Sequence, residues 1–93
     1  MHFVWTEPAI EDVERVYRFL AKVDPVAAAA AIQTLVAAPV NLITWPRSGA
    51  ALTDYEPREV RHLILGHYEL RYEIQGSTIL ILRFWQGAAL TFR

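Results

Sequence analysis

The chain has no cysteine, and Lys22 is its only lysine. It can therefore form no disulfide, zinc–thiolate site or thiol nucleophile, which is compatible with a reducing cytoplasm. A net charge of −1 argues against strong non-specific nucleic-acid binding, which draws on neutralisation of phosphates. With 54% hydrophobic and 20% charged residues in 93 positions, the sequence predicts one folded domain, residues 1–93, with a single modest core.

A leader peptide and a membrane span are not expected. Residues 1–24 carry acids and lack the basic start and apolar segment of a signal peptide. The nearly uncharged run from Pro25 to Pro46 is rich in alanine and contains Pro39, so we predict a buried helix followed by a turn. The chain is expected to be soluble and cytoplasmic.

The first half of the sequence predicts a strand and two helices. Aromatic and β-branched residues indicate a strand over 2–5, and Thr6 is a suitable N-cap for a helix that ends near Val23. Asp24 and Pro25 begin a second helix over 26–38. Pro39 is expected to kink or stop it, unless a further turn carries residues 41–43. The alanines favour close packing of the two helices as an antiparallel hairpin.

The second half predicts a loop that runs to about Pro57 and then three strands, over 60–65, 68–74 and 78–85. Alternation places Tyr72 and its even-numbered neighbours on one face of the middle strand. In the last strand it places Leu80, Leu82 and Phe84 opposite Ile79, Ile81, Arg83 and Trp85. Both of these faces are largely apolar, which predicts a central strand. The expected fold is α+β, with an N-terminal strand, an antiparallel helical hairpin and a mostly antiparallel three-stranded sheet, in the order β-α-α-β-β-β.

Each of the three predicted strands carries one arginine: Arg61, Arg71 and Arg83. An arginine in a core-like strand is costly to bury without a partner. Three on neighbouring strands suggest a cationic face that binds an anionic or polar partner. The alternative is that they lie at the rim and form ion pairs with Glu59, Glu69 and Glu73.

No metal or cofactor site is expected. The histidines are His2, His62 and His67, and the H-x4-H spacing across Gly66 is weak evidence for a ligand set. The glycines are scattered turn residues and form no phosphate-binding motif.

Several segments, in this order, carry a resemblance to a known family. They are Trp5-Thr6-Glu7-Pro8-Ala9, Asp24-Pro25 with Ala30 and Ile32, Leu42 to Gly49, Val60 to Leu63, Tyr68 to Ile74 and Ile81 to Trp85. Together they cover nearly the whole chain and resemble the RelE/ParE toxin superfamily of bacterial type II toxin–antitoxin modules, which stabilise plasmids and inhibit growth.

The ParE-like branch of this family implies a binding protein without a cofactor, which poisons DNA gyrase by protein contact and is neutralised by a cognate antitoxin. The residues predicted to bind the target or the antitoxin are Arg61, Arg71, Arg83, Trp85, Gln86, Phe92 and Arg93. We expect an amphipathic antitoxin helix to dock in an apolar groove left by the hairpin and the sheet, its acids pairing with arginines. Direct nucleic-acid binding should be weak.

Two alternatives remain open from the sequence. One is a RelE-like endonuclease that cleaves mRNA on the ribosome, with Arg61, His67, Arg71 and Arg83 as its catalytic set. Against it, Glu69 replaces an arginine of that branch, and Gln86 and Ala88-Ala89 stand where the family often has histidine and arginine. The other alternative is an inactive toxin homologue retained for antitoxin binding.

Overall fold

The computed structural model describes residues 1–86 of the chain. A five-stranded sheet has the order β1-β5-β4-β3-β2. Strand β1 pairs with β5 in parallel, and the other neighbours are antiparallel. The elements are β1 (His2–Trp5), α1 (Glu7–Val23), α2 (Pro25–Thr44), β2 (Ala50–Ala51), the 3₁₀ turn η1 (Thr53–Tyr55), β3 (Glu59–Leu65), β4 (Tyr68–Gln75) and β5 (Thr78–Gln86).

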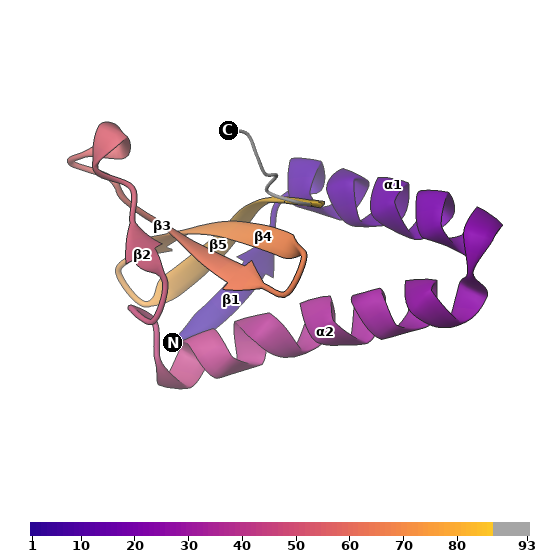
Figure 1. Ribbon diagram of the computed structural model, residues 1–93. Helices are drawn as coiled ribbons and strands as arrows, with labels where there is room; N and C mark the ends of the chain where they lie inside the picture. The colour runs from indigo at the N-terminus through magenta and orange to yellow at the C-terminus, as the bar shows by residue number, and fades with distance from the viewer. Residues whose placement is uncertain (87–93) are drawn as a thin grey trace.

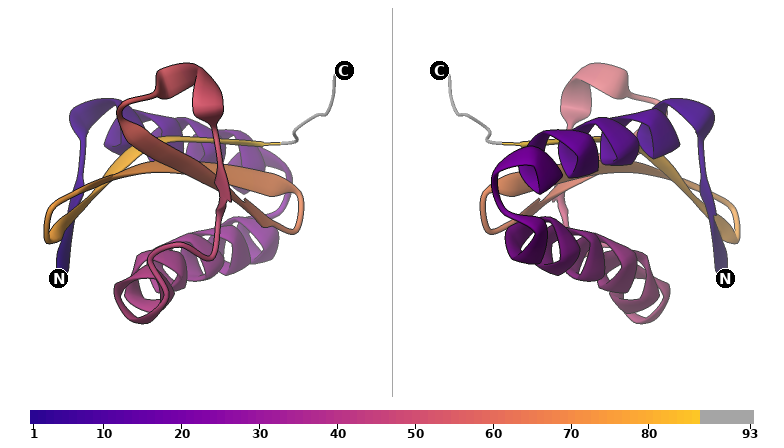
Figure 2. Two further views of the ribbon diagram at one scale, coloured as in Figure 1. Left: turned by 90° about the vertical axis from the view of Figure 1, so that its left-hand side faces the viewer. Right: turned by 90° about the vertical axis from the view of Figure 1, so that its right-hand side faces the viewer.

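The α+β fold predicted from the sequence is confirmed, with the helices arranged as an antiparallel hairpin. Helix α2 runs beneath the curved sheet, while α1 lies beside α2 and against β5 (Figures 1 and 2). The predicted central position of the last strand is also correct, since β5 lies between β1 and β4.

Thr6 fixes the start of α1 to the sheet. Its Oγ1 accepts a hydrogen bond from the Ala9 N–H at 3.4 Å and donates one to the Ile81 carbonyl at 2.7 Å. One hydroxyl therefore caps the helix and joins it to β5, as expected for an N-cap threonine. The predicted end of α1 near Val23 is confirmed.

Helix α2 is longer than predicted. Asp24 caps it by accepting from the N–H groups of Val26 and Ala27 at 3.0 and 3.2 Å. The helix then passes through Pro39 and ends at Thr44, so the expected stop at Ala38 is wrong and the further turn forms. A proline here removes one helical N–H. However, Pro39 and Leu42 are both fully buried, and this burial offsets the loss.

By length and composition α2 could cross a membrane, with a mean hydropathy of 1.8. One of its faces is instead built into the core of a globular domain, through Ala28, Leu35 and Leu42. Such core helices of soluble proteins pass the same length and composition test.

The core lies between α2 and the sheet. The even-numbered residues of β4 share one face, as the alternation predicts, and this face points into the core, with Leu70 and Tyr72 fully buried. We call this side of the sheet the helix-side face and the other side the open face. The main core cluster consists of Ala9, Leu35, Ala38, Leu42, Leu70, Tyr72, Ile74, Ile79, Ile81 and Phe84.

The predicted division of β5 into two faces is wrong beyond Ile81. Arg71 is opposite Arg83 and Tyr72 is opposite Ile81, so the pairing slips by one residue and leaves Leu82 unpaired. A bulge of this kind changes the alternation of side chains from that point on. As a result Ile81 and Phe84 are both buried, at 0% and 1% exposure.

The loop expected before β3 contains two unpredicted elements, β2 and η1. The buried Tyr72 hydroxyl fixes the start of this loop by donating to the Pro46 carbonyl at 2.7 Å and accepting from the Gly49 N–H at 3.0 Å. A Cβ at position 49 would lie 2.6 Å from the His62 carbonyl oxygen, so this close approach requires glycine.

Candidate partner-binding face

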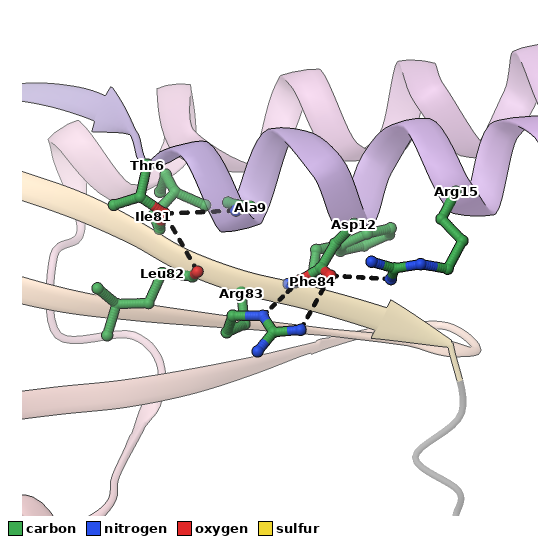
Figure 3. A network of polar contacts seen from close by, with 8 residues as sticks. All are labelled: Thr6, Ala9, Asp12, Arg15, Ile81, Leu82, Arg83 and Phe84. Atoms are coloured by element: carbon green, nitrogen blue, oxygen red, sulfur yellow. Dashed lines mark hydrogen bonds and ion pairs between the residues drawn. The ribbon is translucent and has the colours of Figure 1, made fainter.

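Arg83 holds α1 to the end of β5. Its Nε and Nη2 donate to the two Asp12 carboxylate oxygens at 2.7 and 3.0 Å (Figure 3). The same carboxylate accepts from Arg15 Nη1 at 2.9 Å and from the Phe84 N–H at 3.0 Å. Asp12 is 1% exposed. Burial raises the pKa of its carboxyl, but the hydrogen bonds from Arg83, Phe84 and Arg15 outweigh this effect and hold the pKa below its ordinary value.

Arg61 does not share a face with the other two arginines. It is opposite Tyr72, and residues directly opposite in a sheet point to the same side, so Arg61 lies on the helix-side face near the sheet edge. Its Nε donates to Glu59 at 3.0 Å and its Nη1 to the Gly49 carbonyl at 2.8 Å. The single cationic face expected from the sequence is therefore wrong for Arg61, because its register places it on the other side.

Arg71 and Arg83 are opposite each other on the open face. The guanidinium of Arg71 lies between two aromatic rings, 4.8 Å from the Trp85 centroid and 5.6 Å from the Tyr55 centroid. Its Nη1 donates to the Tyr55 hydroxyl at 2.8 Å, and its Nη2 is 3.5 Å from Glu69. The structure thus brings together two residues predicted from the sequence, Arg71 and Trp85. We call Tyr55, Glu69, Arg71 and Trp85 the Arg71 site.

The alternative of separate ion pairs is partly correct. Arg61 pairs with Glu59 and Arg71 with Glu69, as that hypothesis stated. Glu73, however, pairs with Arg58, through two hydrogen bonds of 2.7 and 3.1 Å.

The three arginines differ in how much of their hydrogen-bonding capacity is used. Within residues 1–86, Arg61 and Arg83 each donate two hydrogen bonds and Arg71 donates one. The Nε of Arg71 is buried without a partner there, as is His62 Nδ1, which is 3.4 Å from Glu69. Arg71 is therefore the arginine of this set that makes the fewest hydrogen bonds to the described part of the chain.

An apolar hollow of about 300 Å³ adjoins this site at the end of β5. It is lined by Arg15, Val16, Phe19, Phe84 and Trp85. Phe19 is 61% exposed. Trp85 therefore borders both the hollow and the Arg71 guanidinium, an arrangement that offers an aromatic surface beside a cation.

Sequence reasoning missed Tyr55 and Arg58. Both come from the loop between β2 and β3, where no alternation or motif indicates which side chains turn back onto the sheet. The pairing of Arg71 with an aromatic residue of that loop depends on tertiary structure. The only local sign that this loop binds something is that an aromatic residue and an arginine, Tyr55 and Arg58, lie three positions apart in it.

The remaining predicted residues have different positions. His67 lies in the turn that follows Leu65, the last residue of β3. Arg61 is four positions before Leu65, about 13 Å along the strand, so the structure does not bring Arg61 and His67 together. Gln86 is paired through its backbone with Tyr68. Phe92 and Arg93 lie outside the described residues. Within residues 1–86, no group of three His, Asp or Glu side chains could hold a metal ion.

Comparison with known proteins identifies the family. The sequence profile of the family described as ParE toxin of type II toxin-antitoxin system, parDE, matches residues 3–90. A chain of the solved structure titled "Chromosomal ParDE TA system from P. aeruginosa" is similar, with a TM-score of 0.76 and 27% sequence identity. The match covers 92% of this chain and 95% of that chain. No curated protein matches the sequence. The chain therefore belongs to the ParE toxin family of type II toxin–antitoxin systems.

Proposed function

We propose that this toxin acts in the cytoplasm by binding DNA gyrase, and that its cognate antitoxin neutralises it by occupying the Arg71 site. The toxin role follows from the family. The Arg71 site is the observation that supports the mode of antitoxin binding, because it combines an incompletely paired cation, two aromatic rings and an adjacent apolar hollow.

The antitoxin segment that fits this face is an acidic amphipathic helix. An antitoxin carboxylate would pair with Arg71 in a partly desolvated setting, where charge-assisted hydrogen bonds are strong. Apolar residues one turn away would fill the hollow beside Phe19 and Trp85. Aromatic residues and arginine are the types that most often dominate interface energies.

Protein binding is favoured over RNA cleavage by the state of the arginines. A nuclease of the ribosome-dependent kind needs cations that can stabilise developing phosphate charge. Here Arg83 is held by Asp12 and Arg61 by Glu59. Moving either one onto phosphate would break an existing ion pair.

The proposed target is tested with three assays: growth of cells that express the protein, and two assays of the purified protein. We expect induced expression to stop growth, and purified protein to inhibit supercoiling by gyrase. We expect no cleavage of mRNA on programmed ribosomes. Ribosome-dependent cleavage that is lost in Arg61→Ala or Arg83→Ala would establish the nuclease instead. No toxicity in any assay, with antitoxin binding retained, would indicate the inactive homologue.

Antitoxin binding is tested at Trp85. We expect Trp85→Ala to weaken binding by more than about 1 kcal/mol, because truncation removes both the wall of the hollow and the ring that faces Arg71. Isothermal titration with the antitoxin encoded beside the toxin measures this. Trp45→Ala is the matched control, since Trp45 is 69% exposed at the end of α2, away from this site. Equal affinities for both variants and the native protein would contradict the proposal.

The C-terminal residues are tested by truncation. We expect deletion of residues 91–93 to relieve toxicity and leave the fold intact, since a terminus contributes little to a core. Growth on induction and the circular dichroism of the purified protein are the two measurements. A truncated protein that is folded and equally toxic would show that these residues are not needed for target binding.

A further inference from the structure

Helix α2 is buried on one side and carries no charge on the other. No charged residue occurs from Pro25 to Thr44. The side facing the sheet is buried, but on the outer side Val26, Val36 and Val40 are 78%, 60% and 56% exposed. A contiguous exposed apolar surface usually marks a contact. In Figures 1 and 2, no element within residues 1–86 lies over this outer side.

Six of the exposed residues form a regular seam. Its positions alternate in steps of three and four, which keeps them on one side of a helix: Val26, Ala29, Gln33, Val36, Val40 and Ile43. We call this set the α2 seam. Val26, Gln33 and Val40 are seven residues apart, as are Ala29, Val36 and Ile43. This is the a/d repeat of a helix pair over nearly three heptads, with one polar residue, Gln33, at an a position.

We propose that the α2 seam is the contact between two copies of this protein, packed as an antiparallel helix pair. Two identical seams without charges can pack together without electrostatic repulsion. A seam of this kind has no charged group with which to recognise a charged partner. The Arg71 site, on the opposite side of the sheet from α2, does offer such selection. The seam thus favours a second copy over the antitoxin.

The position of the seam permits an antiparallel arrangement with full overlap, and the helix dipoles favour it. Its midpoint, between residues 34 and 35, is also the midpoint of α2, so two copies related by a two-fold axis there overlap along the whole helix. That register places Val26 opposite Ile43 and the small Ala29 opposite Val40. The two Gln33 residues are then offset by three positions, about 4.5 Å along the helix axes, and each side-chain amide can donate to the other. Antiparallel helix dipoles also offset each other.

The size of the contact limits its strength. A single pair of 20-residue helices, about 30 Å long, lies at the low end of specific interfaces, below about 1,200 Å². We therefore expect a reversible dimer that dissociates on dilution. The contact leaves the open face of the sheet uncovered in both copies, so a dimer could bind two antitoxin segments.

The first test is sedimentation velocity of the purified protein over a concentration range of about a hundredfold. We expect a monomer–dimer equilibrium, and at least a tenfold increase in its dissociation constant for Val36→Lys, which brings two like charges together near the axis. Asn41→Lys is the matched control. It adds the same charge to an exposed position of the same helix, away from the seam, and should leave the equilibrium unchanged. Circular dichroism checks that both variants are folded.

The second test reads the register directly, since the chain contains no cysteine of its own. A double variant with Ala29→Cys and Val40→Cys cannot close a disulfide within one helix, because 11 residues separate the two sites by about 16 Å. Under mild oxidation we expect disulfides that join position 29 of one copy to position 40 of the other, identified by peptide mass analysis. Links from 29 to 29 would overturn the antiparallel register. A native protein that is monomeric at all concentrations, or a dimer unaffected by Val36→Lys, would overturn the proposal itself.

Discussion

At the scale of single residues, the buried Asp12 joins α1 to β5, two elements that are far apart in the sequence. It accepts four hydrogen bonds, three from arginines and one from the backbone of β5. A buried carboxylate is stable only when such donors replace water. Arg83, which the sequence suggested as a binding residue, is therefore also a structural residue, and mutations at this position need a stability control.

We expect Asp12→Asn to lower the free energy of unfolding by about 2 kcal/mol. The amide keeps the shape of the carboxylate but loses the charge, and its NH₂ group cannot accept from Arg83. The figure is moderate because Arg83 and Arg15 are both more than half exposed and water can solvate them. Urea unfolding measures the change, with Glu14→Gln on the exposed side of α1 as the matched control. A loss no larger than that of the control would contradict the role of Asp12.

At the scale of elements, local patterns predicted what depends on local chemistry. Thr6 and Asp24 indicated the starts of both helices, and the alternation along β4 identified its buried face. The continuation of α2 through Pro39 depends on burial against the sheet, which propensity does not include. The bulge at Leu82 depends on the pairing of β5 with β4, so the sequence of β5 alone could not reveal it. Strand β2 consists of two alanines, which carry no strand signal.

The same reasoning applies to the candidate site. The types of Arg71 and Trp85 in a strand indicated binding residues, and the structure places them together. The separation of Arg61 from Arg71 depends on register, which three isolated strand patterns do not fix. Tyr55 comes from a loop and could not be assigned to either face from the sequence.

We expect Asp24→Ala to destabilise the protein by about 1 kcal/mol, the usual cost of losing an N-cap side chain. For a domain of this size the corresponding decrease in Tm is roughly 4–8 °C. Asp54→Ala is the control, because Asp54 is an exposed acid in η1, whose start has no side-chain cap. Thermal unfolding followed by circular dichroism would reveal equal Tm values for the two variants if the cap were unimportant.

At the scale of the whole molecule, three carboxylates make the free energy of unfolding depend on pH. Beside Asp12, hydrogen bonds from Arg47 to Glu59 and from Arg58 to Glu73 lower the pKa of each carboxyl. The unfolded chain, with ordinary pKa values of about 4, then binds more protons than the folded chain near and below that pH. The stabilisation is fully present above the ordinary values and is lost as pH falls through the lowered ones.

We therefore expect the free energy of unfolding to decrease steadily between about pH 5 and pH 2, measured by urea unfolding at several pH values. Asp12→Asn should show a shallower decrease, since it removes one of the three titrating groups. Equal stability of the native protein at pH 7 and pH 3 would contradict this account.

The parallel pairing of β1 with β5 affects the order in which the molecule can be assembled during translation. His2 is opposite Thr78, 76 positions later, so the first strand made must wait for the last one before its edge is covered. At about 5–20 residues per second, this wait lasts roughly 4–15 s. The helical hairpin can form during that time, but the Asp12–Arg83 contact and the wall of the hollow cannot, because both need β5. The partner-binding face can therefore form only when β5 has emerged from the ribosome.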